Sequence, residues 1–370
     1  MSLLNCLTAR TAKPVAIATL AALSFTAPTQ AISADYSFRL ATIDVETGNY
    51  FNYIAKPFAE LVAELTGGAV EIQPLPAGTV GSVFKLHEAL DDGLVDMVNW
   101  PTVFLGTADP VNAMIGGFPT GLGTDSLLAW TYYGGGQELL TQHRAETMNV
   151  HAMVLGSGPS EWFAHSHVPV QNAEDLANLK YRTLGNWAAI VGEAFGASPT
   201  TVPGSEVYSM LEKKGLDLAE YSLPAENLRQ GYHETAEYII YPGIHAPAWT
   251  FELMIDQDKW AELPDAHKRA MEVAARLVTY DSMFRTINED IGAVLEINQR
   301  AADGKNTLLE LSPEFQAEAR VAARAWATRV AGEAAADGNA WPEKVLASIT
   351  SFQDRWQEGS YYMVTDHASR

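Results

Sequence analysis

The stretch that decides the fold runs from residue 178 to residue 222 and reads NLKYRTLGNWAAIVGEAFGASPTTVPGSEVYSMLEKKGLDLAEYS. Its pattern predicts a strand at Lys180–Leu184, an amphipathic helix with Asn186 as its N-cap, a further helix, and a strand at Leu216–Ser222. Strands that alternate with helices in this way are typical of an α/β fold with a parallel sheet.

Charged and aromatic residues stand at the ends of these two strands. Arg182 lies near the carboxyl end of the first strand, just before a helix N-terminus, and Glu220 and Tyr221 end the second. Open α/β sheets bind ligands at the carboxyl ends of their strands, and a helix N-terminus favours anions. A guanidinium at this place can hold a carboxylate through two hydrogen bonds. The alternative is that Arg182 is a surface or salt-bridge arginine.

The N-terminal third predicts a second lobe of similar construction. Three strands alternate there with two helices, at Tyr36–Asp44, Phe51–Leu65, Val70–Leu75, Val83–Leu90 and Val95–Trp100. This order predicts a parallel sheet with right-handed crossovers. The segment HEALDDGLVDMVNW at 87–100 also resembles YSMLEKKGLDLAEY at 208–221, which supports two similar lobes.

Later segments join the lobes. Two predicted strands, Val150–Leu155 and Glu161–His165, are expected to cross between the lobes, and a third, Trp249–Ile255, is expected to return. The helical pattern of Asp265–Arg300 would span roughly 50 Å and so lie across both lobes. The predicted domains are lobe I (35–154 plus about 248–300), lobe II (155–247 plus about 305–340), and a C-terminal helix and tail at 341–370.

The composition is that of an exported acidic protein. The 370 residues include 45 acidic and 24 basic ones, a net charge of −21, which makes nucleic acid and anionic membranes poor partners. Arg10 and Lys13, the apolar run 14–27 and Thr29-Gln30-Ala31 predict a secretory signal peptide at 1–31. Cys6, the one cysteine, lies inside it, so the mature chain is expected to have no disulfide and no thiol nucleophile.

Signals of catalysis are weak. Residues 155–158, LGSG, lack the spacing of a nucleophile elbow, and residues 233–237, HETAE, lack the second histidine of a zinc protease. His165 and His167 alternate on one face of a strand and could share a metal, but we interpret them as two surface histidines. The sequence therefore predicts a protein that is not an enzyme.

An aromatic set accompanies the arginine. Its members lie at predicted strand tips or helix starts, and they are Trp100, Trp162, Phe163, Trp187 and Tyr221. A small anion in a cleft needs an arginine for its charge and apolar walls that exclude water, and this set supplies the walls. Core packing is the alternative for each of them.

Six motifs along the chain carry a family resemblance. They are GLVDM (93–97), AWTYYGGGQELL (129–140), SEWFAHS (160–166), DLANLKYR (175–182), MLEKKGLDLAEY (210–221) and IIYPG (239–243). With them the chain resembles the periplasmic solute-binding proteins of TRAP transporters, the DctP-type family, and most of all its α-keto acid and lactate-binding branch. The resemblance implies the two-lobe periplasmic binding protein fold, with a hinge and a long helix that spans both lobes.

The resemblance also implies a binding site. Arg182 matches the arginine that binds the ligand carboxylate in that family. The two tyrosines that line the pocket in that branch correspond to positions near Val103 and Phe104 of this chain. In that branch a cation bridges the ligand and the protein. One acidic residue of the cation site, together with the backbone carbonyl of its neighbour, corresponds to Glu220 and Tyr221 in this chain. The second acidic residue falls on Ala246, and Gly158 or Pro159 stands where a glutamine is expected. No cofactor is therefore predicted, and Glu220 is the one residue of that set left to contact a bound Na⁺ or Ca²⁺.

The expected function follows from the resemblance. The chain would be the extracytoplasmic solute-binding subunit of a TRAP transporter, which captures a small organic carboxylate in the periplasm and delivers it to the membrane permease subunits. An exported enzyme and a ligand-sensing protein on the same two-lobe fold stay open as alternatives. A homodimer stays open as well.

Overall fold

The computed structural model describes residues 34–106 and 108–360. The predicted signal peptide at 1–31 and the last ten residues of the predicted tail lie outside the described residues. Within the described part, no helix combines the length and the apolar character that a membrane crossing requires.

The first sheet has the strand order β2-β1-β3-β10-β4. Its strands are β1 (Tyr36–Thr42), β2 (Val70–Leu75), β3 (Met97–Trp100), β4 (Val150–Gly158) and β10 (Trp249–Asp256). Strands β2, β1 and β3 run parallel, as the alternation of strands and helices predicts, and β10 is antiparallel to both β3 and β4. The strands β3 and β10 are buried because helices cover the sheet.

The second sheet has the order β11-β9-β5-β8-β6-β7. Its strands are β5 (Ala164–Ser166), β6 (Lys180–Arg182), β7 (Ser198–Thr200), β8 (Leu218–Ala219), β9 (Tyr238–Tyr241) and β11 (Thr307–Glu310). Strand β6 pairs in parallel with both β7 and β8, so the two strand ends that carry Arg182 and Glu220 lie side by side. The predicted two-lobe α/β fold is confirmed, while the proposed lobe boundaries stay a prediction.

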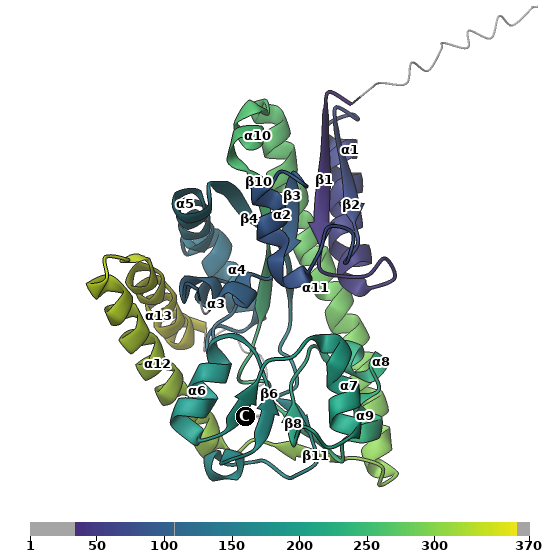
Figure 1. Ribbon diagram of the computed structural model, residues 1–370, viewed down its shortest axis with the longest axis vertical. Helices are drawn as coiled ribbons and strands as arrows, with labels where there is room; N and C mark the ends of the chain where they lie inside the picture. The colour runs from purple at the N-terminus through teal and green to yellow at the C-terminus, as the bar shows by residue number, and fades with distance from the viewer. Residues whose placement is uncertain (1–33, 107, 361–370) are drawn as a thin grey trace, which may run out of the picture. The chain divides into compact units, whose positions relative to one another are not determined.

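Short helices connect the strands of each sheet (Figure 1). Around the first sheet they are η1 (Phe51–Ala55), α1 (Lys56–Leu65), η2 (Val83–Lys85), α2 (Leu86–Asp91), η3 (Thr102–Leu105), α3 (Val111–Ile115), α4 (Thr124–Tyr133), α5 (Gly136–Met148) and α10 (Gln257–Glu262). Around the second they are η4 (Ala173–Leu176), α6 (Gly185–Phe195), α7 (Gly204–Glu212), α8 (Pro224–Arg229) and α9 (Tyr232–Thr235).

Three long helices complete the fold, namely α11 (Asp265–Ala302), α12 (Pro313–Ala336) and α13 (Trp341–Gly359). Helix α11 packs against β4 and α1 of the first sheet and against α8 and β11 of the second. The expectation that one long helix spans both lobes is therefore confirmed. Helix α12 contacts α6, whereas α13 contacts α3, α4 and α5.

Two local predictions were wrong. Asn186 is not the N-cap of α6, because the helix begins at Gly185, Leu184 takes the N-cap position, and no side chain caps it. Gly185 has a φ of +59° and its Cα lies so close to Val103 that an added Cβ would stand 2.6 Å from a Val103 methyl group. Residues 161–163 are not part of a strand, since β5 begins only at Ala164.

Candidate functional site

Arg182 is buried at the end of β6 and is fully engaged by the protein. Its Nη1 donates to the backbone carbonyl of Glu220 at 2.7 Å and to the carboxylate Oε2 of Glu220 at 3.2 Å. Its Nε and Nη2 donate to the carbonyl of Val202 at 3.3 and 3.2 Å. The guanidinium therefore has a fixed direction, with its charge held against Glu220.

Glu220 follows β8 directly and is almost fully buried. Burial raises the pKa of its carboxyl above the usual range, and the adjacent Arg182 guanidinium opposes that rise. Burial makes the Glu220 carboxyl costly to ionise, whereas the Arg182 guanidinium keeps its charge. The two form a charge-assisted pair that is shielded from water.

A cavity of about 120 Å³ has Glu220 in its wall, whereas Arg182 contacts Glu220 but is not itself among the lining residues. Residues of β10, of the first turn of α6 and of the segments that join the strands form its walls, and they are Pro101, Val103, Gly116, Gly117, Pro119, Glu161, Leu184, Asn186, Trp187, Glu220, Tyr221, His245, Ala246, Ala248, Trp249, Thr250 and Phe251. Most of the lining is apolar, and a few polar groups converge on it. This combination is typical of sites for small molecules.

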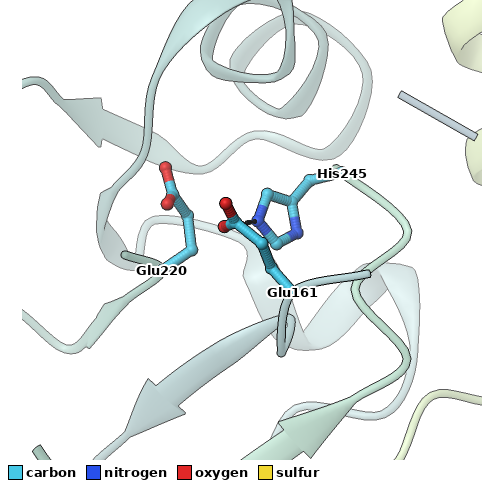
Figure 2. A group of neighbouring side chains, drawn as sticks. All are labelled: Glu161, Glu220 and His245. Carbon is cyan, nitrogen blue, oxygen red and sulfur yellow. Dashed lines mark hydrogen bonds and ion pairs between the residues drawn. The ribbon is translucent and has the colours of Figure 1, made fainter. Parts of the chain in front are cut away.

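Glu161 and His245 join Glu220 on one side of the cavity. Donor atoms of these three residues lie within 4.8 Å of one another. Figure 2 shows the Glu161 carboxylate between the other two side chains, with His245 Nε2 hydrogen-bonded to Glu161 Oε2 at 3.2 Å. The sequence prediction missed Glu161 and His245, although Glu161 directly precedes Trp162 and His245 directly precedes Ala246.

The backbone explains why these two residues meet. The segment that leads into β5 and the one that follows β9 are joined by hydrogen bonds from Glu161 N to the Ala246 carbonyl and from Phe163 N to the Ile240 carbonyl. Gly243 makes the close approach possible, because a Cβ there would stand 2.1 Å from the carbonyl oxygen of Glu161. These backbone contacts therefore place Glu161 and His245 together.

These three residues form the group that could hold a metal ion in the described part of the chain. Two carboxylates and one imidazole suit a divalent transition metal better than Na⁺ or Ca²⁺, which favour oxygen ligands only. However, Glu161 already pairs with His245, and Glu220 already pairs with Arg182. A cation would have to displace both pairs, so the residues fit a bridging Na⁺ or Ca²⁺ poorly.

Trp187 and Tyr221 form apolar walls of the cavity. Trp187 is buried in the first turn of α6. The ring of Tyr221 lies 5.7 Å from the Arg182 guanidinium carbon, and burial raises the pKa of the Tyr221 hydroxyl to about 12. Both side chains therefore present neutral surfaces beside the charged pair.

The other predicted aromatic residues lie behind the lining. Trp100 stacks on His87 and donates to the Val83 carbonyl at 2.7 Å. Phe104 packs edge-on against Phe84. In the same way, Phe163 packs within the core and Trp162 packs against His165. Their role as ligand contacts stays a prediction, and here they hold the walls in place.

Four buried polar atoms of the lining have no hydrogen-bond partner among the described residues. They are Nδ2 of Asn186, Nε1 of Trp187, Nδ1 of His245 and Oγ1 of Thr250. A buried polar group without a partner is costly, so a site that contains four of them is suited to a ligand with polar groups of its own.

The interpretation of His165 as a surface residue was wrong. His165 is fully buried in β5 beside Trp162 and Tyr232. Burial lowers the pKa of its imidazole to about 3. It is therefore a neutral core residue at neutral pH.

Comparisons with known proteins agree with this geometry. The family model DctP, described as bacterial extracellular solute-binding protein, family 7, matches residues 44–333. A monocarboxylate 2-oxoacid-binding periplasmic protein of Nostoc sp. is 25% identical over 268 residues, which cover 72% of this chain and 71% of that protein. The ectoine/5-hydroxyectoine-binding periplasmic protein UehA of Ruegeria pomeroyi is 27% identical, over 78% of this chain and 79% of that protein.

Among solved structures, a TRAP periplasmic solute-binding protein from Pseudoalteromonas atlantica with bound sodium and pyruvate superposes with a TM-score of 0.80. The match covers 88% of this chain and 96% of that one at 22% identity. At this identity the likeness shows the two-lobe fold alone.

Proposed function

Because the chain belongs to the DctP family of bacterial extracellular solute-binding proteins, we propose that it captures a small organic carboxylate in the periplasm and delivers it to the membrane permease of a TRAP transporter. The relatives carry names of solute-binding proteins rather than of enzymes, which supports a role in transport. A small carboxylate is the ligand class that a buried arginine beside an apolar cavity serves best.

The observation that carries this proposal is the position of Arg182. Its guanidinium lies at the end of β6 beside the cavity wall formed by Glu220 and Tyr221. In the bound state, a ligand carboxylate would compete with Glu220 for the guanidinium, and the raised pKa of Glu220 makes that exchange easier. A protonated Glu220 can then donate a hydrogen bond to the ligand instead of repelling it.

The polar groups of the cavity narrow the class of ligand. The carboxylate of Glu161 can accept hydrogen bonds, and the Asn186 amide can donate one. A ligand that carries a hydroxyl or an ammonium group in addition to its carboxylate would satisfy both the hydrogen-bond acceptors and the hydrogen-bond donor of the cavity. We therefore favour a hydroxylated or zwitterionic carboxylate over a plain 2-oxo acid.

The test begins with the protein purified from the periplasm. Mass spectrometry of the denatured protein identifies a ligand that co-purifies, and titration calorimetry with lactate, pyruvate, ectoine and succinate ranks the classes. Ectoine or lactate should bind more tightly than pyruvate. A preference for pyruvate of tenfold or more would contradict the favoured class, and no binding by any carboxylate would contradict the proposal.

Two further measurements separate the alternatives. Incubation of the protein with its ligand should return the ligand unchanged, whereas turnover would indicate an exported enzyme. Uptake of labelled ligand by cells that lack the gene should fall and be restored by the gene. Normal uptake together with a lost transcriptional response would indicate a ligand-sensing protein.

A further inference from the structure

Trp249 is the first residue of β10 and one of the large side chains in the wall of the cavity. Strand β10 pairs with β4, and Trp249 lies directly opposite Gly158, the last residue of β4. The backbone carbonyl of Trp249 also accepts a hydrogen bond from Ser157 Oγ at 2.8 Å. These contacts fix the point of the backbone from which the indole projects.

The indole lies directly on the backbone of Gly158. A Cβ added to Gly158 would stand 2.7 Å from Nε1 of Trp249 and closer still to its Cε2 and Cζ2. The φ of Gly158 is not in the positive range, so its backbone conformation would accept a side chain. The glycine is therefore required by the ring of Trp249 rather than by a turn of the chain.

Two more aromatic rings pack against the indole. The ring centroids of Trp249 and Phe251 are 4.6 Å apart, and Tyr50 lies edge-on to Trp249 at 5.4 Å with an interplanar angle of 80°. Tyr50 and Phe251 also contact each other, with 5.0 Å between their ring centroids. Because the three rings pack mutually, Trp249 has little freedom to rotate and forms a rigid part of the cavity wall.

The cavity that this wall bounds is small. Its volume of about 120 Å³ lies far below the roughly 300–1,000 Å³ of sites for drug-sized ligands. A cavity of about 150 Å³ holds one benzene molecule. By that measure this cavity holds roughly five or six non-hydrogen atoms, which is the size of glycolate or lactate.

We propose that Trp249 determines the specificity of the site, because its indole, lying on Gly158, limits the ligand to carboxylates of about two to four carbon atoms. The inference rests on the proposed function, since it concerns the same cavity and the same class of ligand. Within the hydroxylated and zwitterionic carboxylates favoured above, it selects the shortest members. A smaller side chain at residue 249 would extend the cavity toward Gly158, and longer acids would then fit.

The experiment is titration calorimetry with 2-hydroxy acids that differ only in chain length, namely glycolate, lactate, 2-hydroxybutyrate and 2-hydroxyhexanoate. The wild type should bind glycolate or lactate most tightly and 2-hydroxyhexanoate roughly tenfold more weakly, because the longer tail overpacks the cavity. For Trp249→Ala the order should reverse. A buried methylene group strengthens binding about fourfold where it has room, so this variant should prefer 2-hydroxyhexanoate to lactate.

Two further variants separate the size of the ring from the stability of the fold. Trp249→Phe keeps an aromatic ring and should raise the longest chain that is accepted by an intermediate amount. Trp249→Ala/Gly158→Leu puts a side chain back into the vacated space and should restore the preference for short acids. The matched control is Trp356→Ala, which removes a tryptophan of α13 that stacks on Phe352 and should keep the wild-type order. Circular dichroism and thermal midpoints report whether each variant is folded.

Gly158→Ala tests the contact between the two residues. In the wild-type background the new methyl group overlaps the indole and displaces it, so affinity for lactate should fall roughly tenfold. In the Trp249→Ala background the same change has no ring to displace, so affinity should stay within about twofold. Equal effects of Gly158→Ala in both backgrounds would show that the indole does not lie on Gly158.

The outcomes separate this inference from the proposed function. A wild type that binds 2-hydroxyhexanoate as tightly as lactate, or a Trp249→Ala variant that keeps the wild-type order, would overturn the role of Trp249 while carboxylate binding stands. If none of the four acids binds, the ligand that co-purifies decides. A carboxylate of clearly more than about four carbon atoms would overturn the size limit, whereas a ligand without a carboxylate would contradict the proposed function itself.

Discussion

Arg182 and Glu220 form a buried ion pair, with 3.2 Å between Nη1 of the guanidinium and Oε2 of the carboxylate. The same nitrogen also donates to the backbone carbonyl of Glu220. The arginine that the sequence assigns to the ligand is therefore already part of the internal structure. Removal of either partner affects both binding and folding, and the two effects can be separated by pH and by a second substitution.

The first prediction concerns Arg182→Ala. The substitution should abolish carboxylate binding and also lower the free energy of unfolding by about 3–5 kcal/mol at neutral pH, because it leaves Glu220 buried without its partner. The loss of unfolding free energy should become smaller toward acidic pH. The pKa of Glu220 is higher in the folded than in the unfolded chain, so the buried charge destabilises the variant only as the pH rises above the pKa of Glu220 in the unfolded chain. Urea unfolding at several pH values measures the stability, and calorimetry measures the binding.

The control for this variant is the double substitution Arg182→Ala/Glu220→Gln. It removes the orphaned charge, so it should recover most of the stability while binding stays lost. Near-wild-type affinity in the single variant would show that Arg182 does not hold the ligand. An unchanged unfolding free energy would show that the ion pair contributes nothing to the fold.

The second prediction uses another buried ion pair, Arg144–Glu252. Nε and Nη2 of Arg144 each donate to a different carboxylate oxygen of Glu252 at 2.8 Å, and neither side chain is exposed. Glu252 lies on β10, within the first sheet. Glu252→Gln should lower the free energy of unfolding by about 3–5 kcal/mol and leave ligand affinity within twofold. A parallel loss of affinity, measured on the folded fraction, would show that this pair shapes the binding site.

The third prediction concerns Asp290 on α11. Its carboxylate accepts a hydrogen bond from Ala225 N at 2.9 Å, and burial raises its pKa to about 7 from 3.8, with Glu289 and Glu161 adding to the rise and Arg229 opposing it. Between these values the folded chain keeps a proton that the unfolded chain has released. Stability contributed by Asp290 is therefore lost as the pH rises from about 4 to about 7, up to about 4 kcal/mol.

Asp290→Asn removes this pH dependence because the amide is neutral throughout. The variant should be more stable than the wild type at pH 8, and the difference should vanish near pH 4. Asp281→Asn on the same helix is the matched control, since Asp281 is exposed and pairs with Arg285. Equal changes in unfolding free energy with pH for the wild type and Asp290→Asn would contradict the raised pKa.

Local pattern was enough to predict most of the fold. The alternation of strands and helices predicts the parallel strands around β1 and β6, and the helical period of residues 265–300 predicts α11 almost to its ends. Both sheets are nevertheless mixed, because β10 in the first and β5 in the second run antiparallel to their neighbours. The N-cap at Asn186 was wrong because residue preference alone suggested it. The close approach of Gly185 to Val103, which moves the helix start, is a tertiary contact.

The site was predicted only in part, for the same reason. Trp187, Glu220 and Tyr221 follow the ends of their strands, and strand ends can be read from one segment at a time. Glu161 and His245 are 84 residues apart, in segments with no regular period, and they meet only because β5 and β9 pair. The local sequence pattern of neither segment predicts that β5 and β9 pair.

The last prediction is that tight ligand binding does not depend on a metal ion. The structural neighbour from Pseudoalteromonas atlantica holds sodium together with pyruvate, so the question is open to a direct test. In this chain the carboxylates of Glu161 and Glu220 already face His245 and Arg182. Affinity for the co-purifying carboxylate should therefore stay within threefold after exhaustive chelation and in sodium-free buffer.

The variant Glu161→Gln sharpens this test. It keeps an oxygen acceptor for His245 but removes a charge that a cation would need, so affinity should change little and should not respond to added Ca²⁺, Mn²⁺ or Zn²⁺. Asp281→Asn, at a residue outside the cavity lining, controls for the loss of one negative charge. A hundredfold loss on chelation that one cation restores in the wild type but not in Glu161→Gln would mean that the three residues bind a metal. In that case His245 and Arg182 must release the carboxylates when the ligand enters.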